Sequence, residues 1–140
     1  MCGLAGIHFD SPEALADRDQ LERMVAALHH RGPDGSGFHV EPGVGLGHAR
    51  LSIIDLEGGA QPVHNEDRTV WISYNGEVFN YVELRRLLEQ RGHRFYTNTD
   101  TEVIVHLYEE FGDEFVHELN GQFAFALWDR PRRRLLLVRD

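Results

Sequence analysis

The sequence of 140 residues lacks several features that mark specialised protein classes. It contains one cysteine, which excludes an intramolecular disulfide, and neither a CxxC nor an HExxH metal-binding motif. No apolar run approaches the roughly 20 residues that span a membrane, and the N-terminus lacks the basic segment of a signal peptide. Lysine is absent, and a net charge of −9 disfavours non-specific nucleic-acid binding. We therefore expect a soluble, cytoplasmic protein without a nucleic-acid or membrane partner.

The composition that remains is typical of a globular chain, with 26% charged and 41% hydrophobic residues. At roughly 100–200 residues per domain, the length predicts one domain. The chain stops at LLLVRD, inside an expected strand. We therefore expect a domain that is incomplete at its C-terminus and has an unpaired sheet edge.

Hydrophobic periodicity predicts groups of strands with helices between them. The expected strands are 1–9, 37–40, 43–56, 69–75, 93–99, 121–129 and 133–140, and the expected helices are 17–32, 80–92 and 99–112. The last two strands are expected to pair as a hairpin around 130–132. Asp17 with Gln20 and Asn80 with Glu83 have the spacing of a capping box. The pair Asn75-Gly76 is expected to close its strand. This order favours an α+β fold or a layered sheet–helix sandwich over regular βαβ alternation.

Common catalytic and binding motifs are missing. Ser36 does not lie in a G-x-S-x-G motif, so a nucleophile-elbow hydrolase is not supported. The spacing of Gly43, Gly45 and Gly47 matches neither a dinucleotide-binding fingerprint nor a P-loop. The nine histidines are scattered along the chain, and their spacing predicts no metal site.

Cys2 has three interpretations. It can be a small hydrophobic residue in the first strand, or a lipidated residue, although myristoylation requires glycine directly after Met1. It can also be a nucleophile: once Met1 is removed, Cys2 carries a thiol and a free α-amine that can serve as its base. Its position alone does not decide between these interpretations.

Four polar segments stand out in apolar or glycine-rich surroundings: Arg31–Asp34, His48–Leu51, Asn75–Glu77 and Asp100. Each has an ordinary structural explanation when taken singly. Asn75-Gly76 can be a hairpin turn, Asp100 can cap a helix, and Arg50 can pair with a buried carboxylate.

Taken together, these segments closely resemble the class II glutamine amidotransferases, the N-terminal-nucleophile family. The glutaminase domain of glutamine-hydrolysing asparagine synthetases is the most similar branch. The matching segments are MCGLAGI, RGPDGSG, LGHARLSIIDLEGGAQPV, YNGEVFNYVELRRLLEQRGHRF, TDTEVIVHLYEEFG and LNGQFAFALWDRPRRRLLLVRD. RGPDGSG and GHARLSIIDL differ from the sugar-phosphate branch, and no propeptide precedes Cys2, unlike the purine-pathway branch. The resemblance implies a four-layer αββα sandwich and a glutaminase domain over 1–140, without the synthetase domain.

The resemblance also implies roles for eight residues. Cys2 would attack the side-chain amide of glutamine, and the side chain of Asn75 and the backbone N–H of Gly76 would stabilise the oxyanion. Arg50 would bind the substrate carboxylate. The remaining substrate contacts would come from the carboxylates of Glu77 and Asp100, which receive the ammonium, and from the backbone of Leu51 and Ile53. His48, Arg31 and Asp34 are expected to be structural.

The implied reaction is hydrolysis of glutamine through a thioester on Cys2. The ammonia would serve a C-terminal synthetase domain outside this chain, which converts aspartate to asparagine with ATP and Mg²⁺. No cofactor is expected for the glutaminase domain itself, and a homodimer stays open. The alternatives are the glutaminase half of another asparagine-synthetase-like amidotransferase, including secondary-metabolite enzymes, and a non-catalytic glutamine-binding module that retains Met1. A self-processing amide hydrolase is disfavoured because Cys2 directly follows the start of the chain.

Overall fold

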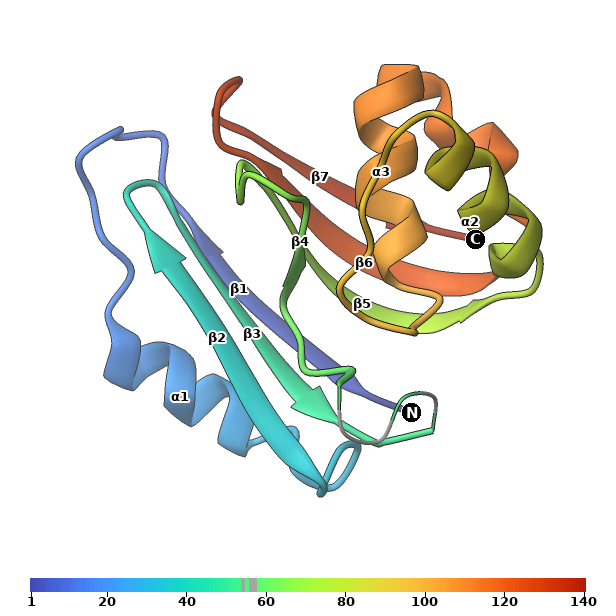
Figure 1. Cartoon of the computed structure of the whole chain (residues 1–140). Coiled ribbons are helices and arrows are strands. Elements are labelled where there is room, and N and C mark those ends of the chain that lie inside the picture. The colour runs from blue at the N-terminus through green and yellow to red at the C-terminus, as the bar shows by residue number, and fades with distance from the viewer. Residues whose placement is uncertain (54, 56–57) are drawn as a thin grey trace.

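The computed structural model describes residues 1–53, 55 and 58–140, which form two antiparallel sheets covered by helices (Figure 1). The first sheet has the order β1-β3-β2, with β1 at Gly3–His8, β2 at Gly35–Glu41 and β3 at Val44–Arg50. The second has the order β4-β5-β6-β7, with β4 at Val63–His64, β5 at Val70–Val78, β6 at Gly121–Asp129 and β7 at Arg134–Arg139. The helices are α1 (Arg18–Ala26), α2 (Tyr81–Gln90), α3 (Glu102–Phe111) and the 3₁₀ helix η1 (Gly112–Glu118).

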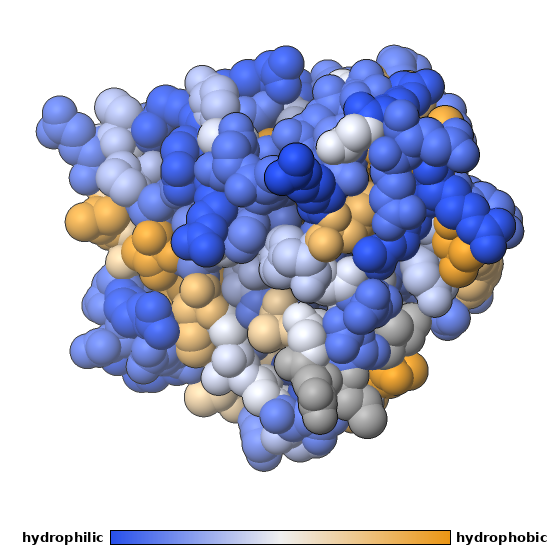
Figure 2. All heavy atoms as spheres, viewed as in Figure 1, coloured by the Kyte–Doolittle hydropathy of each residue, from blue (hydrophilic) through white to orange (hydrophobic). Residues whose placement is uncertain are grey.

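The layers follow the order helix, sheet, sheet, helix. Helix α1 packs on the first sheet, while α2 and α3 cover the second, so the two sheets face each other in the middle (Figure 1). The predicted αββα sandwich is confirmed for the part of the chain that the structure describes. No helix among these residues is long and apolar enough to cross a membrane. The face shown in Figure 2 is mostly hydrophilic, with apolar side chains between the polar ones.

Helix α1 begins as predicted and ends early. The Asp17 carboxylate accepts hydrogen bonds from the backbone N–H groups of Asp19 and Gln20 at 2.9 and 3.3 Å, as an N-cap does. The helix was expected to continue to Gly32, but it ends at Ala26. The next residues form tighter turns, because their N–H groups bond three residues back rather than four.

Two glycines in β3 let α1 approach its sheet closely. A Cβ atom on Gly47 would lie 2.5 Å from the Val25 side chain, and one on Gly45 would lie 2.7 Å from Ala16, just before the helix. Real Cβ atoms essentially never come this close. The expected strand over 43–56 ends at Arg50; Ile54 and Leu56, which it would have included, lie outside the described residues.

The second sheet corrects the prediction for Asn75-Gly76. Strand β5 does not close there but continues to Val78, paired with β6 along its whole length. Pairing with β6 keeps this segment extended: Gly76 lies opposite Phe123 in the ladder, so the chain does not turn there. The predicted hairpin between β6 and β7 is confirmed, and β7 forms one edge of the described sheet.

Two further predictions on the helical side were wrong in detail. Asn80 does precede α2, but its side chain makes no capping bond; it donates to the Glu118 carbonyl and accepts from the Asn120 N–H instead. Segment 93–99 is not a strand. Its backbone N–H groups bond to carboxylates rather than to a ladder: Arg94 donates to Glu66, and Tyr96 and Thr97 donate to Glu102.

The core has one large and one small part. The large part lies between the second sheet and helices α2 and α3, where all residues from Glu102 to Tyr108 are buried. The small part lies between the sheets and centres on Val44, Leu46 and Trp128. Buried polar groups also lie between the sheets: His48 of β3 contacts the Tyr74 carbonyl of β5, and Ser73 of β5 donates to the Gly47 carbonyl of β3.

Candidate active site

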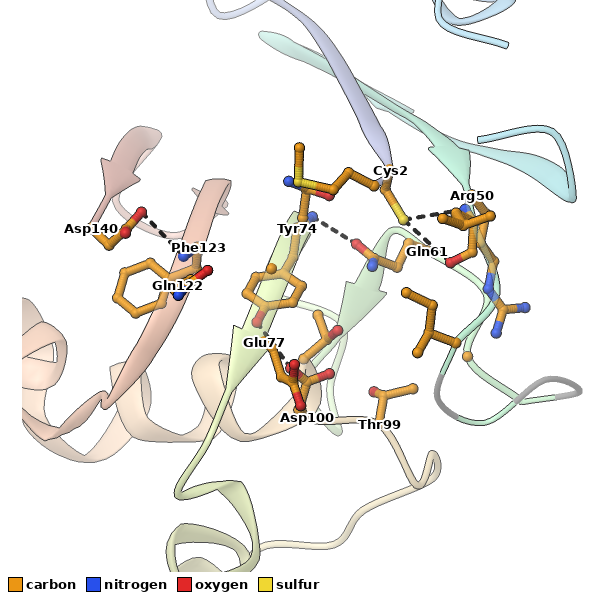
Figure 3. Close-up of a pocket in the computed structure, with 17 residues that line it drawn as sticks. Cys2, Arg50, Gln61, Tyr74, Glu77, Thr99, Asp100, Gln122, Phe123 and Asp140 are labelled. Carbon is orange, nitrogen blue, oxygen red and sulfur yellow. Dashed lines mark hydrogen bonds between the residues drawn. The ribbon is translucent and has the colours of Figure 1, made fainter. Parts of the chain in front are cut away.

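A cavity of about 420 Å³ lies where β1 begins and where β3 and β5 approach the start of α3 (Figure 3). All eight residues singled out by the sequence line it: Cys2, Arg50, Leu51, Ile53, Asn75, Gly76, Glu77 and Asp100. They come from segments that are up to 98 positions apart (residues 2 and 100). The fold therefore brings together every residue that was expected to touch glutamine.

Cys2 lies at the start of β1 with its sulfur close to the segment after β3. The Leu51 N–H lies 3.3 Å from the Cys2 Sγ, and the thiol lies 3.6 Å from the Leu51 carbonyl. The Arg31 guanidinium donates to the Cys2 carbonyl at 3.1 Å. These contacts hold the thiol at the cavity wall, where Met1 also lies.

Arg31, Asp34 and His48 support the cavity without lining it. Asp34 accepts a hydrogen bond from the Ser52 N–H at 2.8 Å and so holds the segment that follows Arg50. His48 is fully buried, and burial lowers its pKa to about 4. Its Nε2 lies 3.0 Å from the Tyr74 carbonyl, which can only accept, so this nitrogen carries the proton of a neutral ring. These positions agree with the structural roles expected for them.

Arg50 ends β3 and is half-buried at the cavity. Its Nη2 donates to the Asp55 carbonyl at 2.6 Å. The Asp55 carboxylate in turn accepts from the N–H groups of Gly58 and Asn98, both at 2.9 Å. These bonds orient the guanidinium, so that a ligand carboxylate would meet a preorganised cation.

Asn75, Gly76 and Glu77 project from the last part of β5. Glycine is required at position 76 by the neighbouring strand, because a Cβ there would lie 2.2 Å from the Gln122 carbonyl oxygen and 2.6 Å from the Phe123 Cα. Strand β6 therefore leaves no room for a side chain on its side of Gly76.

Asp100 is a buried carboxylate rather than a helix cap. Its Oδ2 accepts from the Tyr74 hydroxyl and from the Val78 N–H, both at 2.9 Å, whereas Thr101 occupies the N-cap position of α3. Burial raises the pKa of the Asp100 carboxyl, and the nearby Glu77 charge raises it further, while the two hydrogen bonds oppose the shift. Figure 3 shows Glu77 and Asp100 together on one side of the cavity. A bound cation would relieve their repulsion.

Sequence reasoning missed several residues that line the cavity. Tyr74 holds Asp100, and its N–H donates to the Gln61 side chain at 2.6 Å. The other missed lining residues are Met1, Gly59, Thr99, Thr101, Gln122, Phe123 and Asp140. The one available signal was the position of Tyr74 directly before Asn75. Among the described residues, the one group of three or more side chains close enough to share a metal ion lies outside this cavity.

Comparison with known proteins gives a family match over the whole chain. The model of the glutamine amidotransferase domain matches residues 1–140. The chain is 44% identical to asparagine synthetase [glutamine-hydrolyzing] 1 of Bacillus subtilis, covering 100% of this chain and 22% of that protein. It is also 44% identical to asparagine synthetase [glutamine-hydrolyzing] of Zea mays, covering 100% and 24%. The chain thus spans less than a quarter of these relatives.

A solved structure gives the same fold. Glutamine phosphoribosylpyrophosphate amidotransferase from B. subtilis superposes with a TM-score of 0.73 at 20% identity, over 98% of this chain and 37% of that one. At this identity the likeness concerns the fold alone. It agrees with the αββα layers described above.

Proposed function

The chain belongs to the glutamine amidotransferase family, and from this premise we propose that it hydrolyses glutamine to glutamate and ammonia with Cys2 as nucleophile. The observation that carries the proposal is the cavity, which gathers one thiol, one guanidinium and the neighbouring carboxylates of Glu77 and Asp100. Free glutamine carries one carboxylate, one ammonium and one amide. The cavity therefore offers a complementary group for each polar end of the substrate.

The ends of glutamine define how it would lie. Its carboxylate would bind Arg50 through the paired N–H groups of the guanidinium. Its ammonium would lie between Glu77 and Asp100, whose mutual repulsion it relieves. The side-chain amide would then extend toward Cys2, beside the backbone of Leu51 and Ile53.

The chemistry begins with removal of Met1, which lines the same cavity and blocks the α-amine of Cys2. The freed amine takes the thiol proton, and the sulfur adds to the amide carbon of glutamine. The side-chain NH₂ of Asn75 and the N–H of Gly76 stabilise the oxyanion; losing one such donor costs about 10²–10³ in rate. The amine then protonates the leaving nitrogen, the C–N bond breaks and ammonia departs. Water attacks the thioester, the C–S bond breaks, and glutamate and the thiol form.

The destination of the ammonia is a further part of the proposal. The printed names of the relatives support an aspartate acceptor, converted to asparagine by an ATP- and Mg²⁺-dependent synthetase domain beyond the region matched here. A partner domain of this kind would take up ammonia where the cavity opens. The glutaminase half of another asparagine-synthetase-like amidotransferase would use the same cavity with a different acceptor.

The test compares N-terminal processing, turnover and binding on one preparation. We expect the intact mass to lack Met1, and Cys2→Ala to abolish glutamine hydrolysis while glutamine still binds within about threefold of its original affinity, because Arg50, Glu77 and Asp100 hold it. Undiminished hydrolysis by Cys2→Ala would refute the mechanism. Retained Met1 with glutamine binding and no turnover would instead establish a non-catalytic glutamine-binding module.

A further inference from the structure

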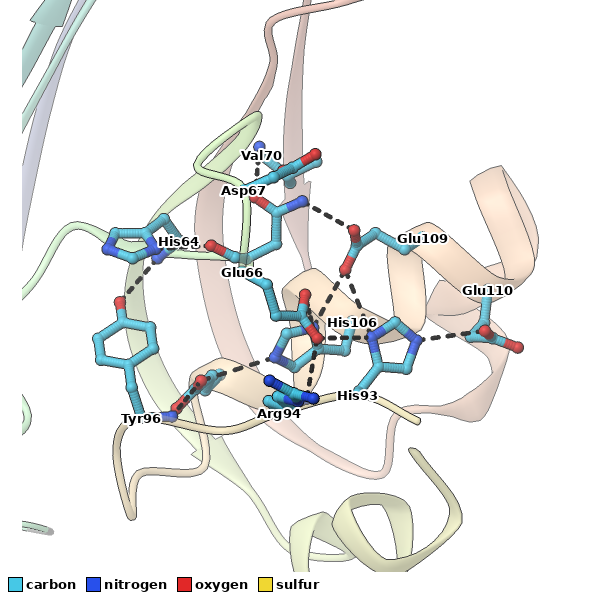
Figure 4. A network of polar contacts seen from close by, with 12 residues as sticks. His64, Glu66, Asp67, Val70, His93, Arg94, Tyr96, His106, Glu109 and Glu110 are labelled. Atoms are coloured by element: carbon cyan, nitrogen blue, oxygen red, sulfur yellow. Dashed lines mark hydrogen bonds and ion pairs between the residues drawn. The ribbon is translucent and has the colours of Figure 1, made fainter. Parts of the chain in front are cut away.

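A second polar centre lies away from the glutamine cavity, beside α3 (Figure 4). Three segments that are distant in sequence meet there. Glu66 lies in the turn between β4 and β5, and His93 follows α2. His106 and Glu109 lie on α3 three residues apart, and so on one face of the helix.

The ring nitrogens and carboxylate oxygens lie close enough together to share one ion. His106 Nδ1 lies 3.1 Å from a Glu109 oxygen and 3.3 Å from one oxygen of Glu66. His93 Nδ1 lies 3.2 Å from the other oxygen of Glu66 and 3.7 Å from the same Glu109 oxygen. All four ligand atoms are within 4.8 Å of one another. Ligands at the usual zinc distances of about 2.0–2.2 Å stand about 3.3–3.6 Å apart in a tetrahedron.

The far nitrogen of each imidazole faces a carboxylate of α3. His93 Nε2 lies 3.2 Å from Glu110, and His106 Nε2 lies 3.6 Å from Glu102. Metal-bound histidines characteristically direct their second N–H to such a carboxylate, which orients the ring and increases its basicity. His106 is fully buried, and its Nε2 has no hydrogen-bond partner among the described residues. A bound ion would draw the ring into place.

The carboxylates are oriented from outside as well. Asn65 donates to Glu109 at 2.7 Å, and the Arg94 N–H donates to Glu66 at 2.9 Å. Each carboxylate therefore has a support that is independent of the imidazoles. Glu66 and Glu109 are also exposed, so an ion could enter from solvent.

The two carboxylates of the centre, Glu66 and Glu109, give it a negative charge that a cation would balance. Two ligand carboxylates would neutralise one divalent ion, and both imidazoles can bind as neutral rings.

We propose that this centre is a tetrahedral site for a divalent transition-metal ion, best matched by zinc, with two nitrogen and two oxygen ligands: Glu66, His93, His106 and Glu109. Four protein ligands leave no open position for substrate, so the site is structural. The ion joins the β4–β5 turn and the segment after α2 to α3. The sequence did not predict it, because only His106 and Glu109 show helical spacing.

The test measures metal binding to the whole chain, purified without a tag and stripped with a chelator, with the metal alone as probe. Cys2→Ala serves as the background, so that the thiol cannot ligate the metal. We expect one equivalent of Zn²⁺ by equilibrium dialysis, a rise in the melting temperature, and a Co²⁺ derivative with the intense visible absorption of tetrahedral coordination.

Variants then locate the ion. Glu66→Gln and His93→Asn should lower the Zn²⁺ affinity at least about tenfold and abolish the thermal shift, and Glu110→Gln should lower it about 10- to 100-fold. His106 is left intact because it is fully buried and its replacement can unfold the chain. The matched control is His117→Asn, which alters an exposed histidine 3.5 Å from Glu114 and should bind Zn²⁺ unchanged.

Two results would contradict the proposed metal site. The first is failure of the stripped Cys2→Ala chain to take up one equivalent of Zn²⁺. The second is an equal Zn²⁺ affinity of the parent, Glu66→Gln and His93→Asn proteins, when circular dichroism shows that each is folded. Neither outcome depends on glutamine hydrolysis, so the site and the proposed function can fail independently.

Discussion

The two buried tyrosine–aspartate pairs Tyr74–Asp100 and Tyr108–Asp129 have the same chemistry but different surroundings. In each, the tyrosine hydroxyl donates to the carboxylate, at 2.9 Å in the cavity and 2.6 Å at the far end of β6. Burial tends to raise the pKa of both carboxyls. The pKa of Asp100 is indeed raised, but the pKa of Asp129 is lowered.

Burial is the largest cause of the raised pKa of Asp100, and the charge of Glu77 adds to it, whereas hydrogen bonds from Tyr108 and Arg132 outweigh burial and lower the pKa of Asp129. Asp129 accepts from both the backbone and the side chain of Arg132, which lies 2.8 Å away. Asp100 faces the negative charge of Glu77 across the cavity. The pair with a cation built into the chain is structural. Under the proposed function, the pair that faces another acid receives a cation from the substrate, at a cost in stability that is common at binding sites.

The largest loss of glutamine binding is expected from removing Arg50, the cation that we propose binds the carboxylate end of glutamine. Arg50→Ala should weaken glutamine binding about 100-fold, because a charged, two-pronged hydrogen bond is lost. Titration calorimetry and the Michaelis constant measure the loss. Arg86→Ala, on the exposed face of α2, is the matched control and should bind normally. A normal Michaelis constant for Arg50→Ala would refute the assignment of Arg50.

Asp100→Asn should weaken glutamine binding about 10- to 100-fold, because the ammonium loses a charged partner. The Tyr74 hydroxyl and the Val78 N–H both donate to the same oxygen of Asp100. The side-chain oxygen of the substituted asparagine can accept both bonds, so the cavity need not rearrange. The matched control is Asp129→Asn, at the other tyrosine–aspartate pair. Equal losses of affinity in the two variants would show that Asp100 does not receive the substrate.

The same two variants should change stability in opposite directions at pH 7. Asp129→Asn should lower the free energy of unfolding by about 1–2 kcal/mol, because the exposed Arg132 loses its partner. Asp100→Asn should raise it by up to about 1 kcal/mol, because a repelled buried charge is removed. Urea unfolding measures both changes, and destabilisation by Asp100→Asn would contradict the raised pKa of Asp100.

The dependence of these changes on pH follows from the direction of each pKa shift. Asp129 stabilises the fold above the unfolded pKa of about 3.8, and this contribution is lost as the pH falls through the lower folded value. Asp100 stabilises the fold below 3.8, and its contribution is lost as the pH rises through the higher folded value. For each variant, the difference in the free energy of unfolding from the parent should therefore change with pH between 7 and 3, and the two variants should show opposite slopes.

The smallest effect is expected from the tyrosine of the cavity. Tyr74→Phe removes the hydroxyl that holds Asp100 and leaves the Val78 bond in place. We expect a few-fold rise in the Michaelis constant for glutamine and little change in kcat, since a neutral hydrogen bond contributes about 1 kcal/mol. Tyr108→Phe should leave both kinetic constants unchanged. An equal kinetic effect of the two variants would mean that the hydroxyl of Tyr74 does not position Asp100.

Local patterns predicted the elements whose partners are close in sequence. The Asp17 cap, the apolar stripe of α1 and the β6–β7 hairpin depend on neighbours within a few residues, so the pattern determined them. Asn75-Gly76 was predicted wrongly because its strand pairs with β6, more than forty residues along the chain. Segment 93–99 was predicted wrongly because backbone N–H groups at Arg94 and Asn98 bond to carboxylates 28 and 43 positions away. A turn signal or a β-rich stretch carries no information about such partners.

The two polar centres differ in the same way. The cavity residues were predicted as a set through the family resemblance, although local rules explained each one singly as a turn, a cap or a core ion pair. For Asp100, the local rules for helices predicted a helix cap, whereas in the structure its carboxylate accepts a hydrogen bond from Tyr74. The centre around His106 was missed entirely, because its ligands span residues 66 to 109 and have no shared motif.

The central claim is that Cys2 reacts with the side-chain carbonyl of a glutamine held in the cavity. The most direct measurement is the mass of the intact protein after incubation with a glutamine analogue that carries an electrophile in place of its amide. Because Cys2 is the only cysteine in the sequence, a thiol adduct identifies its site. We predict one adduct on the N-terminal peptide, without Met1, that excess glutamine prevents and Arg50→Ala slows. An adduct elsewhere, or one on Cys2 that glutamine does not prevent, would contradict the claim.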